Sequence, residues 1–407
     1  MKKIGIIGAG PAGMMAAICA KNENNLVTIF ERNDFPGKKL LMTGGGRCNI
    51  TNTAFYDDFL TNVIRNRKFV YSSFTSFDNY ALMDFLKQNG LDTIEEDCGR
   101  VFPKTEKARD VIAIFQKILK QKSIEVKTNT KIEKVYKDKV FYLTDQNNKT
   151  YELDYLIIAS GGKSYPRTGS DGLGYDLARK LAHKIINPEP VLTPIFIKDR
   201  LGMKAISFSN ISLTVKTDKK DESIRGDILF NKNFVTGPAA LKASSFISDE
   251  DIKGLSVDFF PNITYNELDR EILSLSEENS KKNLINALAK LTKTSLLEEV
   301  TKRLSINPAM KVSELNRSSR KLIIEYLKNF PLTFDRLGGF ETAVVSRGGV
   351  SVKEINPKTM ESKIVEKLFF VGEILDIDSL TGGYNLQVYF STGHACGTFI
   401  KEVTWHI

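Results

Sequence analysis

The chain has 407 residues, of which 42% are hydrophobic, and it carries a formal net charge of +9. That length predicts two domains with room for a third small unit, and the absence of any run of about 18 consecutive apolar residues argues against a membrane-spanning helix. The four cysteines are widely spaced and the three histidines are scattered, with His406 close to the C-terminus. This pattern argues against a redox dithiol, a metal site and a histidine-based triad, and it is typical of a reducing compartment, so we expect a cytoplasmic protein.

The excess of 58 basic over 49 acidic residues is spread along the chain. Lysines alternate with apolar residues in segments such as 117–139, as they do on solvated faces, and aromatic residues are not interleaved with the basic runs. We therefore expect a small-molecule substrate, no stable nucleic-acid partner and no membrane partner. The oligomeric state is left open.

The first elements predict a dinucleotide site. A short apolar strand leads into a G-x-G-x-x-G turn made by Gly8, Gly10 and Gly13, then an alanine-rich helix and a second strand that ends at Glu31. Gly8 allows the tight turn, Gly10 lets backbone approach a pyrophosphate, and Gly13 lets the helix pack on the strand. The helix N-terminus offers N–H groups to phosphates, and Glu31 can accept hydrogen bonds from a ribose diol.

The same residues also resemble a secretory or lipoprotein leader, because two lysines precede an apolar stretch that reaches Ala20. However, glycines disfavour the continuous helix of a leader, and leader chemistry does not require a strand ending at Glu31. We interpret the N-terminus as structural and retained.

The next elements follow a glycine-rich loop over Leu40–Asn49. Apolar periodicity predicts helices over Asn79–Gln88 and Ala108–Lys122, the second capped by Thr105. Strand-like alternation from 124 to 153, with a turn at 145–148, predicts a three-stranded meander, and a buried strand that ends in small residues follows over 155–162.

A composition shift near Pro188–Pro194 marks the start of an insertion. Short strands are expected from 195 to 260, above all over Ile211–Thr217 and Asp227–Phe230, and amphipathic helices from 264 to 329. Strands return after Phe340, with a buried parallel strand over 368–373 and a final helix that begins at a glycine-rich turn over 381–385. The predicted domains are a discontinuous first domain over 1–190 and 346–407, a β-rich insertion over 191–263, a helical subdomain over 264–330, and a return strand over 331–345.

Four glycine-bearing segments lie at the ends of predicted strands, where ligands bind in open parallel sheets. They are the segments 8–13, 159–162, 371–373 and 382–385. One glycine at a strand end is usually only a turn, but the four together favour FAD over NAD. Glu373 would supply a carboxylate for polyol hydroxyls, and the last helix would present its N-terminus to a reduced flavin. The cysteines are interpreted as buried small residues, Cys19, Cys48 and Cys98 among them.

Several of these segments resemble the YhiN/BaiN-type family of NAD(P)/FAD-dependent oxidoreductases, which includes an oxo-bile-acid reductase and an aminoacetone oxidase. The most specific are Thr43–Asn52 (T-G-G-G-R-C-N-I-T-N) and Gly382–Gln387 (G-G-Y-N-L-Q), and Gly99–Pro103 and Ser160–Pro166 add to them. The resemblance spans nearly the whole chain. It implies an α/β fold, namely a Rossmann-like two-dinucleotide-binding FAD domain with an inserted β-barrel-like substrate domain that carries a small helical subdomain.

The resemblance also implies roles for individual residues. The glycine turn and Glu31 would hold the ADP half of FAD, the loop at 47–49 would lie near the flavin, and 372–373 with 385–386 would address the ribityl chain and the ring. The complete predicted cofactor set is Gly8, Gly10, Pro11, Ala12, Gly13, Glu31, Arg32, Lys39, Thr43, Gly44, Gly45, Gly46, Arg47, Cys48, Asn49, Ala159, Ser160, Gly161, Gly162, Gly372, Glu373, Gly383, Tyr384, Asn385 and Leu386.

Two segments depart from the family pattern. Phe230–Pro238 lacks the family's histidine, and Val388-Tyr389 stands where members commonly have a tryptophan followed by a small residue. The first departure puts a substrate role for that histidine position in doubt. No catalytic acid or base is assigned, and Tyr384 and Arg47 are retained only as residues expected near the ring.

We therefore expect an FAD-dependent oxidoreductase that transfers a hydride between its flavin and a small organic substrate, with NAD(P)H as the reductant. The segment 169–174 (G-S-D-G-L-G) has the wrong glycine order for a second fingerprint, so NAD(P)H would dock transiently at the flavin. The alternatives are an aminoacetone-type amine oxidase that uses O2, a tRNA-modifying flavoprotein, and a flavin-binding sensor without turnover. The substrate, the choice of NADH or NADPH, and covalent linkage of the flavin are left open.

Overall fold

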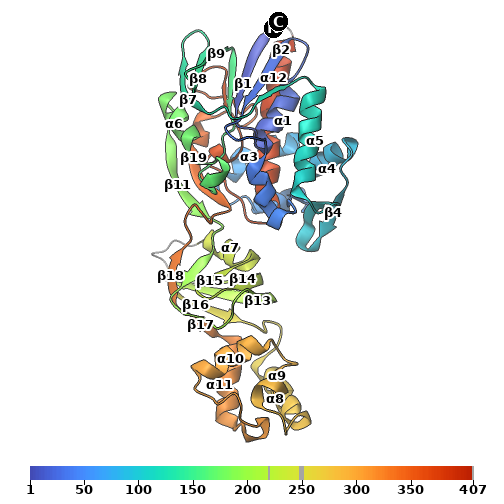
Figure 1. The fold of residues 1–407 in the computed structure, drawn as a ribbon, viewed down its shortest axis with the longest axis vertical. Helices are drawn as coiled ribbons and strands as arrows, with labels where there is room; N and C mark the ends of the chain where they lie inside the picture. The colour runs from blue at the N-terminus through green and yellow to red at the C-terminus, as the bar shows by residue number, and fades with distance from the viewer. Residues whose placement is uncertain (219–220, 247–251, 406–407) are drawn as a thin grey trace. The chain divides into compact units, whose positions relative to one another are not determined.

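The computed structural model describes residues 1–218, 221–246 and 252–405, and the chain divides into two units (Figure 1). The first unit comprises Met1–Val191 and Phe340–Ile407, and the second comprises Leu192–Gly339. Each unit has its own hydrophobic core. Within the described ranges, no helix is both long enough and apolar enough to cross a membrane. His406 lies outside the described residues.

A five-stranded parallel sheet forms the centre of the first unit, in the order β20-β10-β1-β2-β6. Each strand pairs in parallel with its neighbours, so that Ile7 lies opposite both Phe30 and Ile158. Parallel sheets are covered on both faces and need continuously apolar strands, and β10 is buried at every position. The predicted α/β fold with a Rossmann-like sheet is confirmed. The strands are β1 (Lys2–Ile7), β2 (Asn25–Phe30), β6 (Glu125–Lys127), β10 (Tyr155–Ile158) and β20 (Leu368–Phe370).

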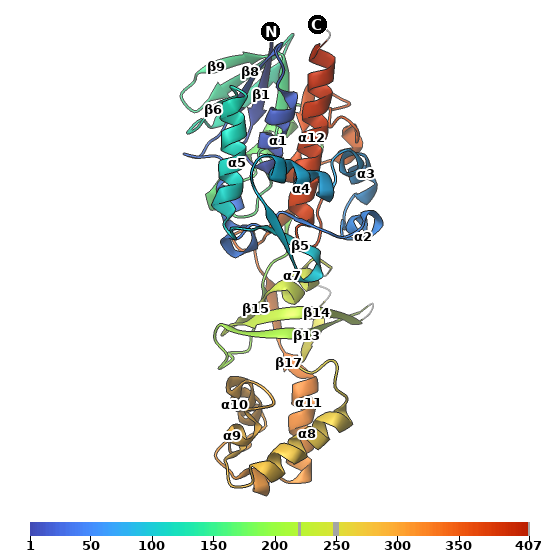
Figure 2. The same cartoon turned by 90° about the vertical axis from the view of Figure 1, so that its right-hand side faces the viewer.

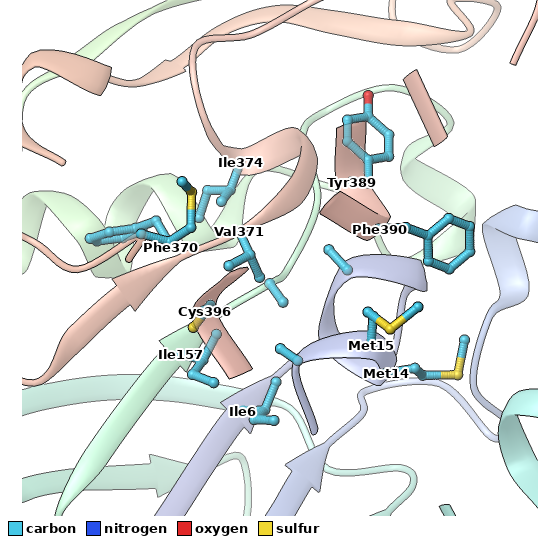
Figure 3. Close-up of a cluster of buried hydrophobic side chains, with 14 of the residues drawn as sticks. Ile6, Met14, Met15, Ile157, Phe370, Val371, Ile374, Tyr389, Phe390 and Cys396 are labelled. Atoms are coloured by element: carbon cyan, nitrogen blue, oxygen red, sulfur yellow. The ribbon is translucent and has the colours of Figure 1, made fainter. Parts of the chain in front are cut away.

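Two helices, α1 (Pro11–Ala20) and α12 (Tyr384–Trp405), pack closely against each other, as Figure 2 shows. Glycines on α12 permit the close approach, because a Cβ atom at Gly393 or Gly397 would collide with a carbonyl oxygen of α1. Figure 3 shows how side chains from the sheet and from both helices fill the space between them. These side chains include Ile6, Met14, Met15, Ile157, Phe370, Val371, Phe390 and Cys396.

The predicted cap of helix α5 (Ala108–Gln121) is wrong. The position before the helix is held by Lys107, and no side chain caps the first turn. The backbone turns at Glu106, which has a φ of +56° and donates its N–H to Pro103 O at 2.8 Å. Thr105 lies inside this turn and therefore cannot reach the free N–H groups of α5.

The predicted three-stranded meander is present, but it begins at Ile132 and not at 124. The first strand in the predicted range, β6, lies outside the meander and pairs in parallel with β2, because the α5 crossover returns the chain to the edge of the main sheet. The other strands form the antiparallel sheet β7-β8-β9, comprising β7 (Ile132–Lys137), β8 (Phe141–Asp145) and β9 (Thr150–Leu153). The predicted turn is present, since Asp145 accepts hydrogen bonds from Asn147 N and Lys149 N, each at 2.9 Å.

Shorter elements complete the first unit. Helix α4 (Asn79–Gln88) has the predicted bounds, and the Asp78 carboxylate caps it by accepting from Ala81 N at 2.8 Å. Strands β11 (Ile185–Val191) and β19 (Val345–Val350) form an antiparallel pair where the chain leaves and re-enters this unit. The remaining elements are β3 (Thr51–Asn52), α2 (Tyr56–Thr61), α3 (Arg67–Ser76), β4 (Thr93–Glu96), β5 (Arg100–Pro103) and α6 (Leu173–Lys180).

The second unit contains an antiparallel sheet in the order β17-β16-β13-β14-β15-β12-β18. Its two edge strands, β17 and β18, are separated in the chain by Thr333 alone, so the sheet must curl to bring its edges together, as barrels do. The strands are β12 (Ile195–Ile197), β13 (Ile206–Thr217), β14 (Asp221–Phe230), β15 (Phe234–Thr236), β16 (Ile252–Asp258), β17 (Phe330–Leu332) and β18 (Phe334–Leu337).

Helices make up the rest of the second unit. Helix α8 (Tyr265–Glu278) begins at a capping box formed by Thr264 and Glu267 and buries one apolar stripe, as the periodicity of this region predicts. The others are α7 (Pro238–Ser244), α9 (Leu284–Leu288), α10 (Thr294–Arg303) and α11 (Arg317–Lys328).

Candidate cofactor site

An open cleft of about 1200 Å³ lies where β1, β2, β10 and β20 end. Every residue that lines it belongs to the first unit. The lining comes from residues 7–12, 30–33, 37–43, 130–132, 159–161, 168–177, 344–345, 371–373 and 385–389.

The glycine turn after β1 shapes one end of the cleft. Gly8 has a φ of +105°, and a Cβ atom there would lie 2.5 Å from Ala159 O; a Cβ atom at Gly13 would collide with Gly8 O. Gly10 differs, because a Cβ atom there would meet nothing within 4 Å. Gly8 and Gly13 are therefore required by packing, whereas Gly10 leaves open space at the N-terminus of α1, where free N–H groups favour an anion.

Glu31 follows β2 and is buried at the wall of the cleft. Its Oε2 accepts from Ala9 N at 2.8 Å, and its Oε1 accepts from Asn33 N and Asn33 Nδ2 at 2.8 and 2.7 Å. A carboxylate has about four acceptor positions, so Glu31 braces the glycine turn and keeps capacity for a ligand hydroxyl.

A segment that the sequence analysis set aside, 168–174, also lines the cleft, next to the residues after Glu31. Arg32 pairs with Asp171 at 2.6 Å and donates to Gly169 O at 3.2 Å, and Asn33 Nδ2 donates to Thr168 O at 3.0 Å. The two residues after Glu31 thus hold this part of the wall in place.

Glu373 follows β20 and forms a buried polar cluster with Lys39. Its Oε2 accepts from Lys39 Nζ at 2.6 Å, while its Oε1 accepts from Ser164 Oγ at 2.7 Å and from Ser346 N at 3.0 Å. The Glu373 carboxylate therefore joins four segments of the first unit and neutralises a lysine at the cleft wall.

The N-terminus of α12 closes the cleft. A Cβ atom at Gly383, which has a φ of +97°, would collide with Thr51 O. The side chain of Asn385 binds its own loop: Oδ1 accepts from Ser379 N at 2.9 Å, and Nδ2 donates to Ser379 O and Leu380 O. Asn385 and Leu386 line the cleft in the first turn of α12, where backbone N–H groups have no helical acceptor.

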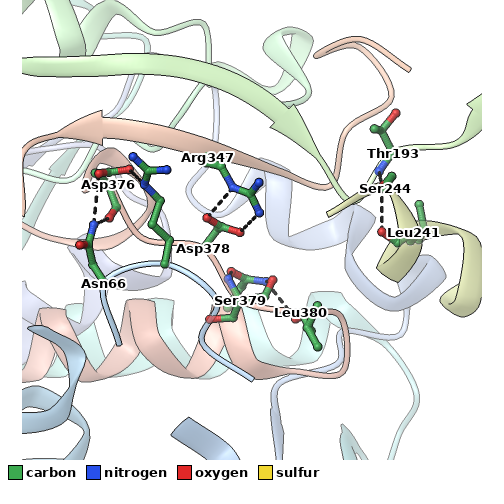
Figure 4. A network of polar contacts seen from close by, with 11 residues as sticks. Asn66, Thr193, Leu241, Ser244, Arg347, Asp376, Asp378, Ser379 and Leu380 are labelled. Atoms are coloured by element: carbon green, nitrogen blue, oxygen red, sulfur yellow. Dashed lines mark hydrogen bonds and ion pairs between the residues drawn. The ribbon is translucent and has the colours of Figure 1, made fainter. Parts of the chain in front are cut away.

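Two ion pairs fix the segment between β20 and α12, and Figure 4 shows the one between Arg347 and Asp378. Arg347 donates to both carboxylate oxygens of Asp378, at 3.0 and 2.9 Å, and Arg65 pairs with Asp376 at 2.6 Å. Asp378 is fully buried, so its bidentate partner offsets the cost of burying the charge. This network positions the start of α12 without lining the cleft.

Fifteen of the predicted residues line the cleft, and ten do not. Those on the wall are Gly8, Gly10, Pro11, Ala12, Glu31, Arg32, Lys39, Thr43, Ala159, Ser160, Gly161, Gly372, Glu373, Asn385 and Leu386. The predicted residues that do not line the cleft are Gly13, Gly44, Gly45, Gly46, Arg47, Cys48, Asn49, Gly162, Gly383 and Tyr384.

Residues of the 44–49 loop have partners of their own. Arg47 pairs with Glu96 and Glu106 and lies over the ring of Phe102, and hydrogen bonding to Arg47 lowers the pKa of Glu96. Asn49, with its amide oriented to accept from Gly383 N at 3.1 Å, ties the loop to the start of α12.

The cysteines are mostly as predicted. Burial raises the pKa of Cys48 to about 12, and it also raises the pKa of Cys396, so both thiols stay neutral. Cys19 is only half-buried, and Cys98 is exposed, at a φ of +61° in the turn between β4 and β5, where a tight backbone turn leaves its side chain outside any core.

Sequence reasoning missed several cleft residues, including ten in 130–132 and 168–177 as well as Tyr389. For the segment 168–174, its three glycines were the available signal. Three residues that line the cleft, Ser160, Ser170 and Tyr389, have buried hydroxyls, and among the described residues none of these hydroxyls has a hydrogen-bond partner. Open space at a helix N-terminus and unpartnered hydroxyls fit a ligand that carries phosphate and sugar oxygens, as FAD does.

The fold and this cleft define the class of protein: a Rossmann-type oxidoreductase that uses FAD. The chain belongs to the HI0933-like family, since the model described as HI0933-like protein Rossmann domain matches residues 2–399.

Named relatives match over their whole length. The chain is 27% identical over 402 residues to a ribosomal RNA dihydrouridine synthase of Haemophilus influenzae, covering 98% of each protein. It is 28% identical over 419 residues to a 3-dehydro-bile acid delta(4,6)-reductase of Clostridium scindens, covering 99% of this chain and 100% of the relative. Among solved structures, a 3-ketosteroid-delta4-(5alpha)-dehydrogenase from Rhodococcus jostii RHA1 shares the fold, with a TM-score of 0.53, 12% identity, and coverage of 98% of this chain and 97% of that chain.

Proposed function

We propose that the protein is an FAD-dependent reductase that saturates a carbon–carbon double bond in an electron-poor organic substrate, with NAD(P)H as the reductant. The names of the two relatives, a dihydrouridine synthase and a delta(4,6)-reductase, both describe the addition of hydrogen to a double bond. This shared chemistry favours a reductase over the amine oxidase that the sequence left open.

The observation that carries the proposal is the convergence of two helix N-termini, those of α1 and α12, on one cleft. Each N-terminus carries a partial positive charge of about half an elementary unit. One would favour the pyrophosphate, and the other would favour the negative charge of a reduced ring. When bound, FAD supplies the centre that accepts a hydride and passes it on.

The net reaction consumes NAD(P)H and one proton. The π bond of the substrate breaks and two C–H bonds form, one from the hydride with its electron pair and the other from the proton, while NAD(P)⁺ is released. The described part of the chain contains one Rossmann-type sheet with one glycine fingerprint, so the proposal has NAD(P)H dock at the cofactor cleft itself.

Anaerobic mixing of the holoenzyme with NADH, NADPH or aminoacetone tests the proposal. We expect NADH or NADPH to remove the visible absorbance of the flavin within seconds, and an α,β-unsaturated ketone to restore it without oxygen. Bleaching by the amine alone, with no response to either nicotinamide, would refute the reductase and support the oxidase.

A second candidate substrate is a uridine in RNA. Two relatives, from Haemophilus influenzae and Escherichia coli, are named as ribosomal RNA dihydrouridine synthases. In the second unit, the exposed side chains of Lys282 and Lys311 come from adjacent segments, because Val312 N donates to Lys282 O at 3.1 Å and Asn283 pairs with Lys311. Lys281 is also exposed and neighbours them in the chain, so these lysines offer positive charge to a phosphate backbone.

Binding to ribosomal RNA over a salt series distinguishes the two substrates. An RNA substrate predicts affinity that falls steeply with salt and weakens further in the triple variant Lys281→Glu, Lys282→Glu, Lys311→Glu. A small-molecule reductase predicts no saturable RNA binding at low salt, and unchanged reduction of the ketone by that variant.

A further inference from the structure

The cofactor cleft contains hydroxyl groups that the protein itself leaves unsatisfied. Ser170 and Tyr389 line the cleft and are 5% and 6% exposed, yet within the described ranges neither hydroxyl has a hydrogen-bond partner. Buried polar groups are nearly always paired, and an unpaired one costs about 1–3 kcal/mol. A partner from outside the chain would remove that cost.

Tyr389 stands beside the two segments that shape the middle of the cleft. It lies on α12, and its Cβ is 3.9 Å from the position that a Cβ atom of Gly372 would take. Gly372 in turn faces Ala12 in the first turn of α1. In Figure 3 the hydroxyl oxygen of Tyr389 points away from the hydrophobic cluster that contains Met15 and Phe390.

The surroundings of Tyr389 make it a hydrogen-bond donor. Burial raises the pKa of its hydroxyl well above the ordinary value, and the nearby carboxylates of Glu373 and Asp378 raise it further. The hydroxyl therefore keeps its proton throughout the physiological range and suits an acceptor oxygen.

Ser170 lies in the part of the cleft wall that contacts on Arg32 hold in place. The ion pair of Arg32 with Asp171 and the hydrogen bond from Arg32 to Gly169 O lie on either side of it. Its Oγ would be 2.8 Å from a Cβ atom at Gly161, so it faces the bare backbone after β10. The segment 168–174 thus places the Ser170 hydroxyl at the cleft, where no group of the described chain forms a hydrogen bond with it.

We propose that Tyr389 and Ser170 are FAD-binding residues whose hydroxyls donate hydrogen bonds to phosphate or sugar oxygens of the cofactor. The inference rests on FAD as the cofactor and not on the reductase activity proposed above. Enclosed water is the competing explanation for both hydroxyls, and it predicts no effect on FAD affinity.

The test measures FAD affinity in protein stripped of its flavin, by quenching of flavin fluorescence. The variants are Tyr389→Phe and Ser170→Ala, each of which removes only the hydroxyl. Matched controls are Tyr175→Phe and Ser379→Ala, because those hydroxyls are also buried and unpartnered in the described structure but do not line the cleft. Melting of the stripped proteins should be unchanged or slightly raised in all four variants, since each loses an unsatisfied polar group.

We expect Tyr389→Phe and Ser170→Ala each to raise the Kd for FAD about tenfold, which is about 1.4 kcal/mol, while both controls stay within twofold of the wild type. A Kd within twofold of the wild type in both cleft variants would overturn the inference and leave the reductase proposal standing. Equal losses in cleft and control variants would also overturn it, as a general effect of hydroxyl removal. A wild-type chain that takes up no FAD would overturn the inference together with the cofactor assignment.

Discussion

Replacing Lys39 by methionine tests whether the buried cluster around Glu373 is held by charge. Glu373 is 5% exposed and would keep its hydrogen bonds from Ser164 and Ser346 but lose the ion pair at 2.6 Å. Breaking a buried ion pair costs about 3–5 kcal/mol because the remaining charge is uncompensated. The Lys39 side chain is 23% exposed, so some solvent reaches the pair and we expect about 2–3 kcal/mol.

Thermal unfolding of flavin-free protein measures this cost without a contribution from cofactor contacts. For a domain of this size the loss corresponds to a fall in Tm of roughly 4–10 °C. The double variant Lys39→Met, Glu373→Gln should recover part of that loss, because glutamine removes the charge and keeps an acceptor for Ser164.

Lys38→Met is the matched control, since the side chain of this neighbour is 38% exposed and its contact with the exposed Asp34 is 3.6 Å long. Exposed pairs of this kind contribute about 0–1 kcal/mol, so its Tm should barely move. Equal Tm values for Lys39→Met and Lys38→Met, or a double variant less stable than Lys39→Met, would refute the reasoning.

Three further outcomes follow from the geometry. Gly10→Ala should cost under about 1 kcal/mol of stability but weaken FAD binding at least tenfold, whereas Gly13→Ala should lower the stability by about 2–3 kcal/mol. Thermal melting and FAD titration distinguish the two variants, and equal losses of stability in both would contradict the packing argument. Iodoacetamide should label Cys98 alone in the native protein near pH 8, since burial raises the pKa of Cys48 to about 12; intact-mass analysis with a Cys98→Ser control checks this, and labelling of the control would contradict it. Burial lowers the pKa of His183 and His394 in the folded state. Because the unfolded chain, with a histidine pKa of about 6.5, binds protons more readily, the free energy of unfolding should fall as the pH drops below that value. Tm measured from pH 7.5 to 5.5 should therefore fall less in a His183→Gln, His394→Gln variant, and parallel curves for variant and wild type would be the contrary result.

The parts of the fold that could be predicted depend on neighbours in the sequence. The glycine turn follows β1 directly, Asp78 caps the helix that begins one residue later, and the strand at 368–370 is apolar throughout. Each signal acts within a few residues, where spacing and side-chain chemistry decide the structure. The α/β class and the four strand-end segments of the cleft were accessible for this reason.

The parts that could not be predicted depend on long-range contacts. The wall at 168–174 is placed by Arg32, about 140 residues earlier in the chain, and nothing in its own sequence specifies that partner. Thr105 looked like a helix cap, but the positive φ of Glu106 decides where the first turn begins. The sequence places Tyr389 in a helix of mostly apolar residues, and only the structure shows that its hydroxyl lacks a hydrogen-bond partner among the described residues.

The position of the cleft makes the proposals separable by experiment. All its lining residues belong to the first unit, whereas Lys281, Lys282 and Lys311 belong to the second. Mutations that share no partners usually act additively, so charge reversal at these lysines should leave the Kd for FAD unchanged, even if RNA binding is lost. Loss of hydroxyls at Tyr389 and Ser170 should do the opposite. A lysine variant that binds FAD more weakly would mean that the second unit contributes to cofactor binding, and the cleft could then no longer be treated as complete within the first unit.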